Sequence, residues 1–129
     1  MLVVDDERDM REMLAFALEM DGFEIVTAAS GREAVAISSK RKFAIVITDL
    51  KMPDMDGLAT LDALKRIDQN VKVIVATGYA SPETRSDCLR RGAFAYLCKP
   101  FDLDELGALL RRTQEEPEPP LAPAWGEQA

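Results

Sequence analysis

The chain has 129 residues, of which 47% are apolar and 30% charged, and its net charge at pH 7 is −7. This length and composition are typical of one globular domain with a full hydrophobic core. No apolar run approaches the roughly 20 residues that span a membrane, and no signal peptide is visible. Because there are only two cysteines, Cys88 and Cys98, we expect no disulfide framework and a reducing, cytoplasmic environment. The lack of a long apolar run adds the expectation that the protein has no membrane segment.

The charge is unevenly distributed, and histidine is absent. Residues 114–129 carry four glutamates and no base, a charge of −4 that leaves −3 for residues 1–113. A mildly acidic domain is a poor binder of nucleic acid, so we expect no direct contact with it. Without histidine, a Ser-His-Asp or Cys-His site, a histidine metal site and a phosphohistidine on this chain are all excluded. If phosphate chemistry occurs here, its donor is another molecule.

The first half of the chain predicts three strands separated by two helices. The strands are expected at residues 2–4, 23–28 and 43–48, where apolar residues run continuously. Gly22 is expected to stop the first helix, and Ser30 to cap the second, which runs through residues 34–37. The inward face of the first helix is expected to consist of Met10, Met13, Leu14, Ala17 and Leu18.

The second half continues the same alternation. A third helix is expected from Gly57 onward, and further strands at residues 71–76 and 95–97. Ser81-Pro82-Glu83 is a strong helix start, with an N-cap, a proline at the first position and an acid in the first turn. The predicted inward residues are Leu58, Leu61, Leu64 and Ile67 in the third helix, and Leu103, Leu106, Leu109 and Leu110 in the last, which ends at Arg111-Arg112.

Five alternations of strand and helix predict an α/β fold with a five-stranded parallel sheet, covered by helices on both faces. The continuous apolar strands agree with two covered faces. The expected architecture is a doubly wound, flavodoxin-like (βα)5 domain with strand order 2-1-3-4-5, over residues 1–113. Residues 114–129 contain four of the seven prolines and are expected to be a disordered tail or linker. Trp125 lies in this segment, either incidentally or as an anchor for a partner.

Three acids stand at strand ends: Asp5 and Asp6 after the first strand, and Asp49 after the third. In the order 2-1-3-4-5 these strands are neighbours, and the crevice of the sheet opens between them. Three converging carboxylates repel one another, and a hard, oxygen-seeking cation such as Mg²⁺ relieves the repulsion. Singly, each acid could be no more than a helix cap.

Two further strand ends add complementary groups. Thr77 ends the fourth strand with a hydroxyl group, and Lys99 ends the fifth with a cation. Acids that hold a metal, together with a hydroxyl and an ammonium group, fit a phosphoryl group that is placed on Asp49. Taken alone, Thr77 could be a turn residue and Lys99 a surface lysine. Four strand ends that each present a suitable group are hard to obtain by chance.

These strand ends lie in four stretches: Val3-Val4-Asp5-Asp6-Glu7, residues 47–57, Ala76-Thr77-Gly78 and Lys99-Pro100-Phe101. Together they resemble the motifs of the receiver domain of two-component response regulators, and the resemblance covers about residues 1–113. It implies that the chain is a signalling phosphoacceptor rather than an enzyme with its own substrate. It also implies a fold that the alternation of elements already predicts.

The resemblance assigns roles residue by residue. Asp49 would accept a phosphoryl group from a histidine kinase or phosphotransfer protein. Thr77 and Lys99 would bind the phosphoryl oxygens, and Tyr96 would be the switch aromatic, which turns inward when Thr77 moves. The Lys99-Pro100 peptide would be cis. Mg²⁺ would be held by Asp5, Asp6, Asp49 and the backbone carbonyl of Lys51.

The output is open at this stage. An arginine-rich surface on the fourth helix, fifth strand and fifth helix is either a solvated face or a surface for a partner, an output domain or a second copy of the chain. Its members are Arg85, Arg90, Arg91, Arg111 and Arg112. No helix-turn-helix or P-loop pattern follows residue 113, so the domain either stands alone or has been cut from a longer regulator at its linker.

Three rival classes share parts of this pattern. A Mg²⁺-dependent phosphatase with an Asp nucleophile usually has D-x-D after its first strand, where this chain has Asp5-Asp6-Glu7. A flavodoxin-like FMN binder needs a Ser/Thr/Gly phosphate loop at the same place, and these acids would repel the phosphate. A pseudo-receiver without chemistry would not need the full set of acids, Thr77 and Lys99.

Overall fold

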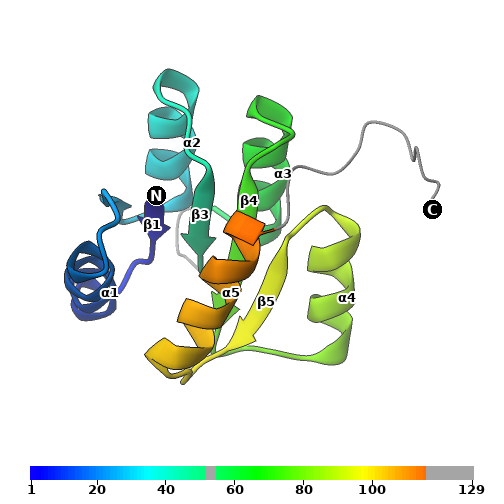
Figure 1. Ribbon diagram of the computed structural model, residues 1–129. Helices are drawn as coiled ribbons and strands as arrows, with labels where there is room; N and C mark the ends of the chain where they lie inside the picture. Colours follow the sequence, from blue (N-terminus) through cyan, green and yellow to red (C-terminus); the bar gives the residue numbers. More distant parts are fainter. Residues whose placement is uncertain (52–54, 116–129) are drawn as a thin grey trace.

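A computed structural model describes residues 1–51 and 55–115 (Figure 1). Five strands and five helices alternate along the chain, as the sequence predicts. The strands are β1 (Leu2–Val4), β2 (Val26–Ala28), β3 (Ile45–Thr48), β4 (Lys72–Thr77) and β5 (Ala95–Cys98). The helices are α1 (Arg8–Met20), α2 (Gly31–Lys40), α3 (Gly57–Ile67), α4 (Pro82–Arg90) and α5 (Leu103–Glu115).

The strands form one parallel sheet in the order β2-β1-β3-β4-β5, which confirms the predicted topology. Val4 pairs with Ala28 on one side and Thr48 on the other, so the strands on either side of β1 end level with it. The chain leaves β1 toward one edge of the sheet and returns for β3 on the opposite side of it. The strand order therefore reverses at β1 and β3, where open α/β sheets bind ligands.

Two apolar layers enclose the sheet. One layer packs α1 and α5 against it, through side chains such as Leu14 and Leu106. The other packs α2, α3 and α4, through side chains such as Ala34, Leu61 and Cys88. Every residue of β1 and β3 is buried, as expected for strands covered on both faces. None of the helices within the described residues is both long and apolar enough to cross a bilayer.

The helix boundaries follow the predicted signals. Gly22 and Gly92 have φ angles of 96° and 101°, the left-handed conformation that ends a helix. Ser30 caps α2 by accepting a hydrogen bond from the backbone N–H of Glu33. Ser81 caps α4, and Pro82 occupies the first helical position as predicted.

Several element limits differ from the prediction. Strand β2 begins at Val26 rather than residue 23, because it is an edge strand whose only partner, β1, offers three residues. Strand β3 begins at Ile45 rather than residue 43. Helix α5 continues to Glu115, so residues 114 and 115 are helical. The remainder of the expected linker, including Trp125, lies outside the described residues.

Three residues predicted to face inward are substantially exposed. Met13 is 45% exposed, Ile67 is 37% exposed and Leu103, the first residue of α5, is 46% exposed. Helix α1 carries apolar side chains around most of its circumference, and the layer between α1 and the sheet is filled by Leu14 and Leu18. The periodicity of the sequence wrongly predicted that Met13 faces the sheet, because the apolar stripe of α1 is wider than the face that the helix buries.

Gly57 is required by a close backbone approach at the start of α3. A Cβ atom at this position would lie 2.3 Å from the Leu50 Cα atom and 2.5 Å from its carbonyl oxygen. The Leu50 carbonyl also accepts a hydrogen bond of 3.0 Å from the Gly57 N–H. A side chain here would therefore push away the backbone next to Asp49.

Substituting Gly57→Ala should lower the free energy of unfolding by about 2 kcal/mol, the usual cost of overpacking. Urea denaturation measures the loss. Gly107→Ala is the matched control, because its Cβ would meet nothing closer than Arg111 Nη1 at 3.6 Å. In this helical position alanine should stabilise by roughly 0.5–1 kcal/mol. Equal effects of the two substitutions would contradict the steric argument.

Candidate functional site

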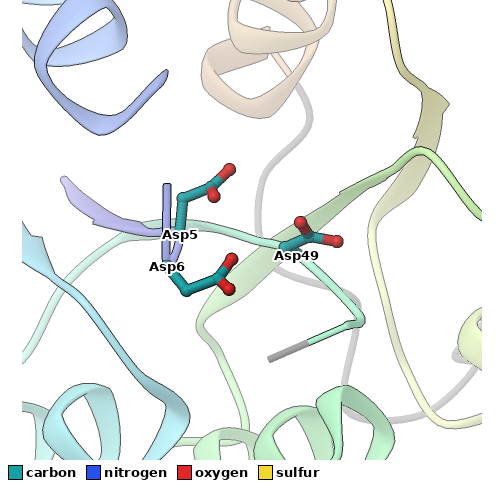
Figure 2. Close-up of side chains that lie close together, drawn as sticks. All are labelled: Asp5, Asp6 and Asp49. Carbon is teal, nitrogen blue, oxygen red and sulfur yellow. The ribbon is translucent and has the colours of Figure 1, made fainter. Parts of the chain in front are cut away.

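The carboxyl ends of β1 and β3 bring the three acids together (Figure 2). The ladder continues one residue past each strand, since the Asp5 N–H donates to the Ala28 carbonyl and the Asp49 N–H to the Val4 carbonyl. Asp5 and Asp49 are buried, whereas Asp6 is exposed. One carboxylate oxygen from each of the three acids lies within 4.8 Å of the others. The predicted cluster is therefore present.

Lys99 lies between the two buried acids. Its Nζ atom is 2.7 Å from Asp5 Oδ2 and 3.0 Å from Asp49 Oδ2. Burial acts to lower the pKa of the Lys99 ammonium group, but hydrogen bonds and charge from Asp5 and Asp49 outweigh it and raise the pKa above its ordinary value. The backbone N–H of Lys99 donates to the Thr77 carbonyl at 2.8 Å, which fixes the start of the side chain.

The remaining oxygens of the buried acids are held by backbone groups. Asp49 Oδ1 accepts hydrogen bonds from the N–H groups of Leu50, at 2.6 Å, and Lys51, at 3.3 Å. Asp5 Oδ1 accepts one from the Glu7 N–H at 2.9 Å. Each buried carboxylate thus has one oxygen bound to the backbone and the other to Lys99, which fixes its orientation.

Asp49 opens into a depression of about 690 Å³ at this edge of the sheet. Lys51 and Tyr79 both line the depression and contact each other. The Lys51 Nζ atom lies 4.8 Å from the centroid of the Tyr79 ring. This is a cation–π contact. The lining residues are Asp6, Glu7, Asp49, Lys51, Gly78, Tyr79 and Lys99. The depression therefore combines acids, a buried ammonium group and an aromatic wall.

Thr77 ends β4 at the same edge. Its side chain is fully buried, and its Oγ1 atom accepts a hydrogen bond of 3.0 Å from the Tyr79 N–H. The hydroxyl group is therefore bound to its own loop. Cys98, its partner in β5, directly precedes Lys99. The edge thus carries the three kinds of group that the sequence predicts at the strand ends, namely acids, a hydroxyl and an ammonium group, and Tyr79 adds an aromatic ring.

Comparison with known proteins decides the family. A family model described as the response regulator receiver domain matches residues 1–111. The chain belongs to the response regulator receiver domain family. The resemblance of its strand-end motifs to this family is confirmed, and so is the fold that the family implies.

Individual relatives of this receiver domain agree. It is 35% identical over 105 residues to sporulation initiation phosphotransferase F of Bacillus subtilis, a match that covers 81% of this chain and 85% of that protein. It is 41% identical over 111 residues to the regulatory protein AtoC of Escherichia coli, covering 86% of this chain but only 24% of AtoC. The solution structure of the beryllofluoride-activated NtrC4 receiver domain dimer superimposes with a TM-score of 0.83 at 33% identity, covering 88% of this chain and 94% of that one.

Two other predicted features of the receiver domain are present. The Lys99-Pro100 peptide is cis. Tyr96 is half-buried on β5 and packs against the layer formed by α2, α3 and α4. Its hydroxyl oxygen lies 2.6 Å from Thr84 Oγ1 on α4.

Thr84 is the polar neighbour that the sequence analysis missed. It lies three residues after the Ser81 N-cap, the position from which a capping box closes, but the usual sequence signal there is Glu or Gln rather than Thr. The contact with Tyr96 was not predictable from the sequence, because it joins α4 to a strand that follows it in the chain.

Proposed function

We propose that Asp49 accepts a phosphoryl group from a histidine kinase or phosphotransfer protein. The observation that carries the proposal is the carboxylate of Asp49, held by Lys99 and two backbone N–H groups and opening into the depression. An Asp49 oxygen would attack the phosphorus atom of a phosphohistidine on the donor. The O–P bond forms as the N–P bond breaks, and the freed imidazole nitrogen takes a proton from solvent. Because these 129 residues contain no histidine, the donor histidine would lie outside them.

Three groups of the chain would stabilise the phosphoryl oxygens. Lys99 is already within hydrogen-bonding distance of Asp49 and would supply a positive charge. Thr77 would donate its hydroxyl hydrogen once its side chain turns toward the depression. The backbone N–H groups after Asp49 would keep the acyl oxygen oriented. The chain would catalyse only its own phosphorylation and dephosphorylation.

The donor set fits Mg²⁺. Asp5, Asp6 and Asp49 offer oxygens within 4.8 Å of one another, and the backbone carbonyl of Lys51 would complete the protein ligands. Bound there, Mg²⁺ would neutralise charge on the phosphoryl oxygens. Lys99 supplies one positive charge against the three carboxylates of the cluster, which supports a cation requirement.

The output would pass through the α4-β5-α5 surface. Phosphorylation would bias two states that differ in the positions of Thr77 and Tyr96, and a partner would select one of them. The partner would be an output domain, another protein or a second copy of the chain, in the cytoplasm. The NtrC4 receiver forms a dimer, which supports the last option. AtoC is about four times as long as this domain, which supports the first.

A small phosphodonor tests the proposal directly. Incubation with acetyl phosphate and Mg²⁺ should add the mass of one phosphoryl group, and hydroxylamine should remove it, as expected for an acyl phosphate. Chelation of Mg²⁺ should prevent the addition. Steady turnover of a phosphomonoester without a labelled protein would instead favour the phosphatase.

The Lys51–Tyr79 contact should set the lifetime of the aspartyl phosphate. Because the two side chains flank the depression, removing the ring in Tyr79→Ala should open a path for water and speed hydrolysis about two- to fivefold, the equivalent of one exposed cation–π contact. Tyr79→Phe keeps the ring and should hydrolyse like the unmodified protein. Release of phosphate after removal of the donor measures both. A slower rate in Tyr79→Ala would contradict the shielding role.

A further inference from the structure

We infer that Thr84 is a positioning residue that ties Tyr96 to the first turn of helix α4. The inference rests on the proposed function, since it assigns a coupling role within the same switch. Its basis is a set of hydrogen bonds around the Thr84 hydroxyl group that includes both the α4 cap and the Tyr96 hydroxyl.

The Thr84 hydroxyl group has four polar neighbours. Its Oγ1 atom accepts a hydrogen bond of 3.1 Å from the Ser81 N–H, and it lies 3.1 Å from the Ser81 carbonyl oxygen and 3.0 Å from Ser81 Oγ. The fourth neighbour, the Tyr96 hydroxyl at 2.6 Å, is the nearest. Three of these contacts belong to the capping box, and the fourth joins it to β5.

Proton counting assigns the direction of the Tyr96 contact. A hydroxyl group can donate once and accept twice. The Ser81 N–H must donate to Thr84, and the Ser81 carbonyl can only accept from it. The position that is left on Thr84 is an acceptor, and two hydroxyl groups compete for it: that of Tyr96 at 2.6 Å and that of Ser81 at 3.0 Å. We assign the position to the nearer group, so Tyr96 donates its phenolic hydrogen and its loss frees this position.

Helix α4 is held differently at its two ends. Near its C-terminus, Arg91 pairs with Asp62 of α3 at 2.5 Å and with Asp87 of α4 at 3.1 Å, and Cys88 is buried in the core. At its N-terminus the polar contacts are the capping box and Tyr96. The N-terminal turn is thus the end of α4 that responds to Tyr96.

The same turn is linked to the site through the loop after β4. Thr77 Oγ1 is bound to the Tyr79 N–H, two residues before the Ser81 cap. If Thr77 turns toward a phosphoryl group on Asp49, this bond is lost and the loop to Ser81 is released. Thr84 would then transmit the change, because it contacts both Ser81 and Tyr96.

Amide hydrogen exchange of the full chain tests the tie without phosphate. The N–H groups of Ser81, Thr84 and Arg85 bond to Thr84 Oγ1, Ser81 Oγ and the Ser81 carbonyl, so they report on the capped turn. Tyr96→Phe removes only the phenolic hydroxyl and should speed exchange at these amides about three- to tenfold, the effect of one lost hydrogen bond. The amide of Arg91 should be unaffected.

Substitutions at Thr84 separate coupling from simple capping. Thr84→Ser keeps the hydroxyl and should restore slow exchange. Thr84→Val should speed it, and adding Tyr96→Phe to Thr84→Val should have no further effect. Thr27→Val, at an exposed threonine of β2, is the matched control. Unchanged exchange in Tyr96→Phe, or additive effects in the double variant, would overturn the inference.

Phosphorylation in the same samples distinguishes the two proposals. Acetyl phosphate with Mg²⁺ should label Asp49 to the same extent in the unmodified protein and in Thr84→Val. The chemical shifts of Thr84 and Arg85 should respond to labelling in the unmodified protein, and residue 85 should not respond in Thr84→Val. A labelled Thr84→Val protein with a full response would overturn the coupling role. Failure to label any variant would overturn the proposed function. The exchange rates would still show whether Thr84 links Tyr96 to the first turn of α4.

Discussion

Substituting Asp49→Asn should abolish labelling by acetyl phosphate and Mg²⁺. The amide oxygen is a far weaker nucleophile than a carboxylate, and the amide nitrogen cannot accept the hydrogen bonds that Lys99 and Leu50 donate to the present oxygens. Intact-mass spectrometry should detect no added phosphoryl group under conditions that label the unmodified protein.

The matched control is Asp104→Asn, at an exposed acid in the first turn of α5. It removes the same charge and should be labelled like the unmodified protein. Folding of Asp49→Asn can be verified by circular dichroism, since the variant removes one charge from a repulsive cluster and should not unfold the domain. Labelling that survives in Asp49→Asn would disprove the assignment of the phosphoacceptor.

Substituting Lys99→Met should destabilise the protein by about 3 kcal/mol, because it leaves two buried carboxylates without their cation. Added Mg²⁺ should restore more stability to this variant than to the unmodified protein, since binding to the folded state stabilises it by mass action. Urea denaturation with and without Mg²⁺ measures both effects. Lys40→Met, at an exposed lysine of α2, should change stability by no more than about 0.5 kcal/mol.

The contribution of Lys99 should also have a defined pH dependence. Because the folded protein raises the pKa of this group, its stabilising effect is complete below the ordinary lysine pKa and is lost as the pH rises through the raised value. The difference between the unmodified protein and Lys99→Met should therefore be constant from neutral pH to about pH 10 and shrink only above it. A difference that disappears near pH 7 would contradict the ion pair.

The sequence predicts the fold through two agreeing signals. Continuous apolar runs such as Ile45–Thr48 identify buried parallel strands, and caps such as Ser81-Pro82 identify where helices begin. The limits of β2 could not be predicted, because they depend on the length of its partner β1. The exposure of Met13 could not be predicted either, because eight of the thirteen residues of α1 are alanine, leucine, methionine or phenylalanine and the helix alone does not show which ones meet the sheet.

Most of the candidate site was predictable because the strand order alone brings its residues to the same edge of the sheet. Once β1 and β3 are neighbours, Asp5 and Asp49 must meet. The position of the Lys99 ammonium group between them follows from a side-chain conformation and needed the structure. The same holds for the Thr84–Tyr96 contact and for the placement of Lys51 over the Tyr79 ring, since each joins segments whose separation in the chain says nothing about distance.

Strand β5 has a mechanical consequence for this domain. It lies at the edge of the sheet and pairs only with β4, whereas β1, β3 and β4 each pair on both sides. Shifting it therefore breaks one ladder of hydrogen bonds, where shifting an interior strand would break two. This edge strand carries Tyr96 and leads directly into Lys99. The least costly backbone movement near Asp49 would thus be a shift of β5. Such a shift would move the Lys99 ammonium group, which faces the acids, together with the Tyr96 ring, which contacts α4.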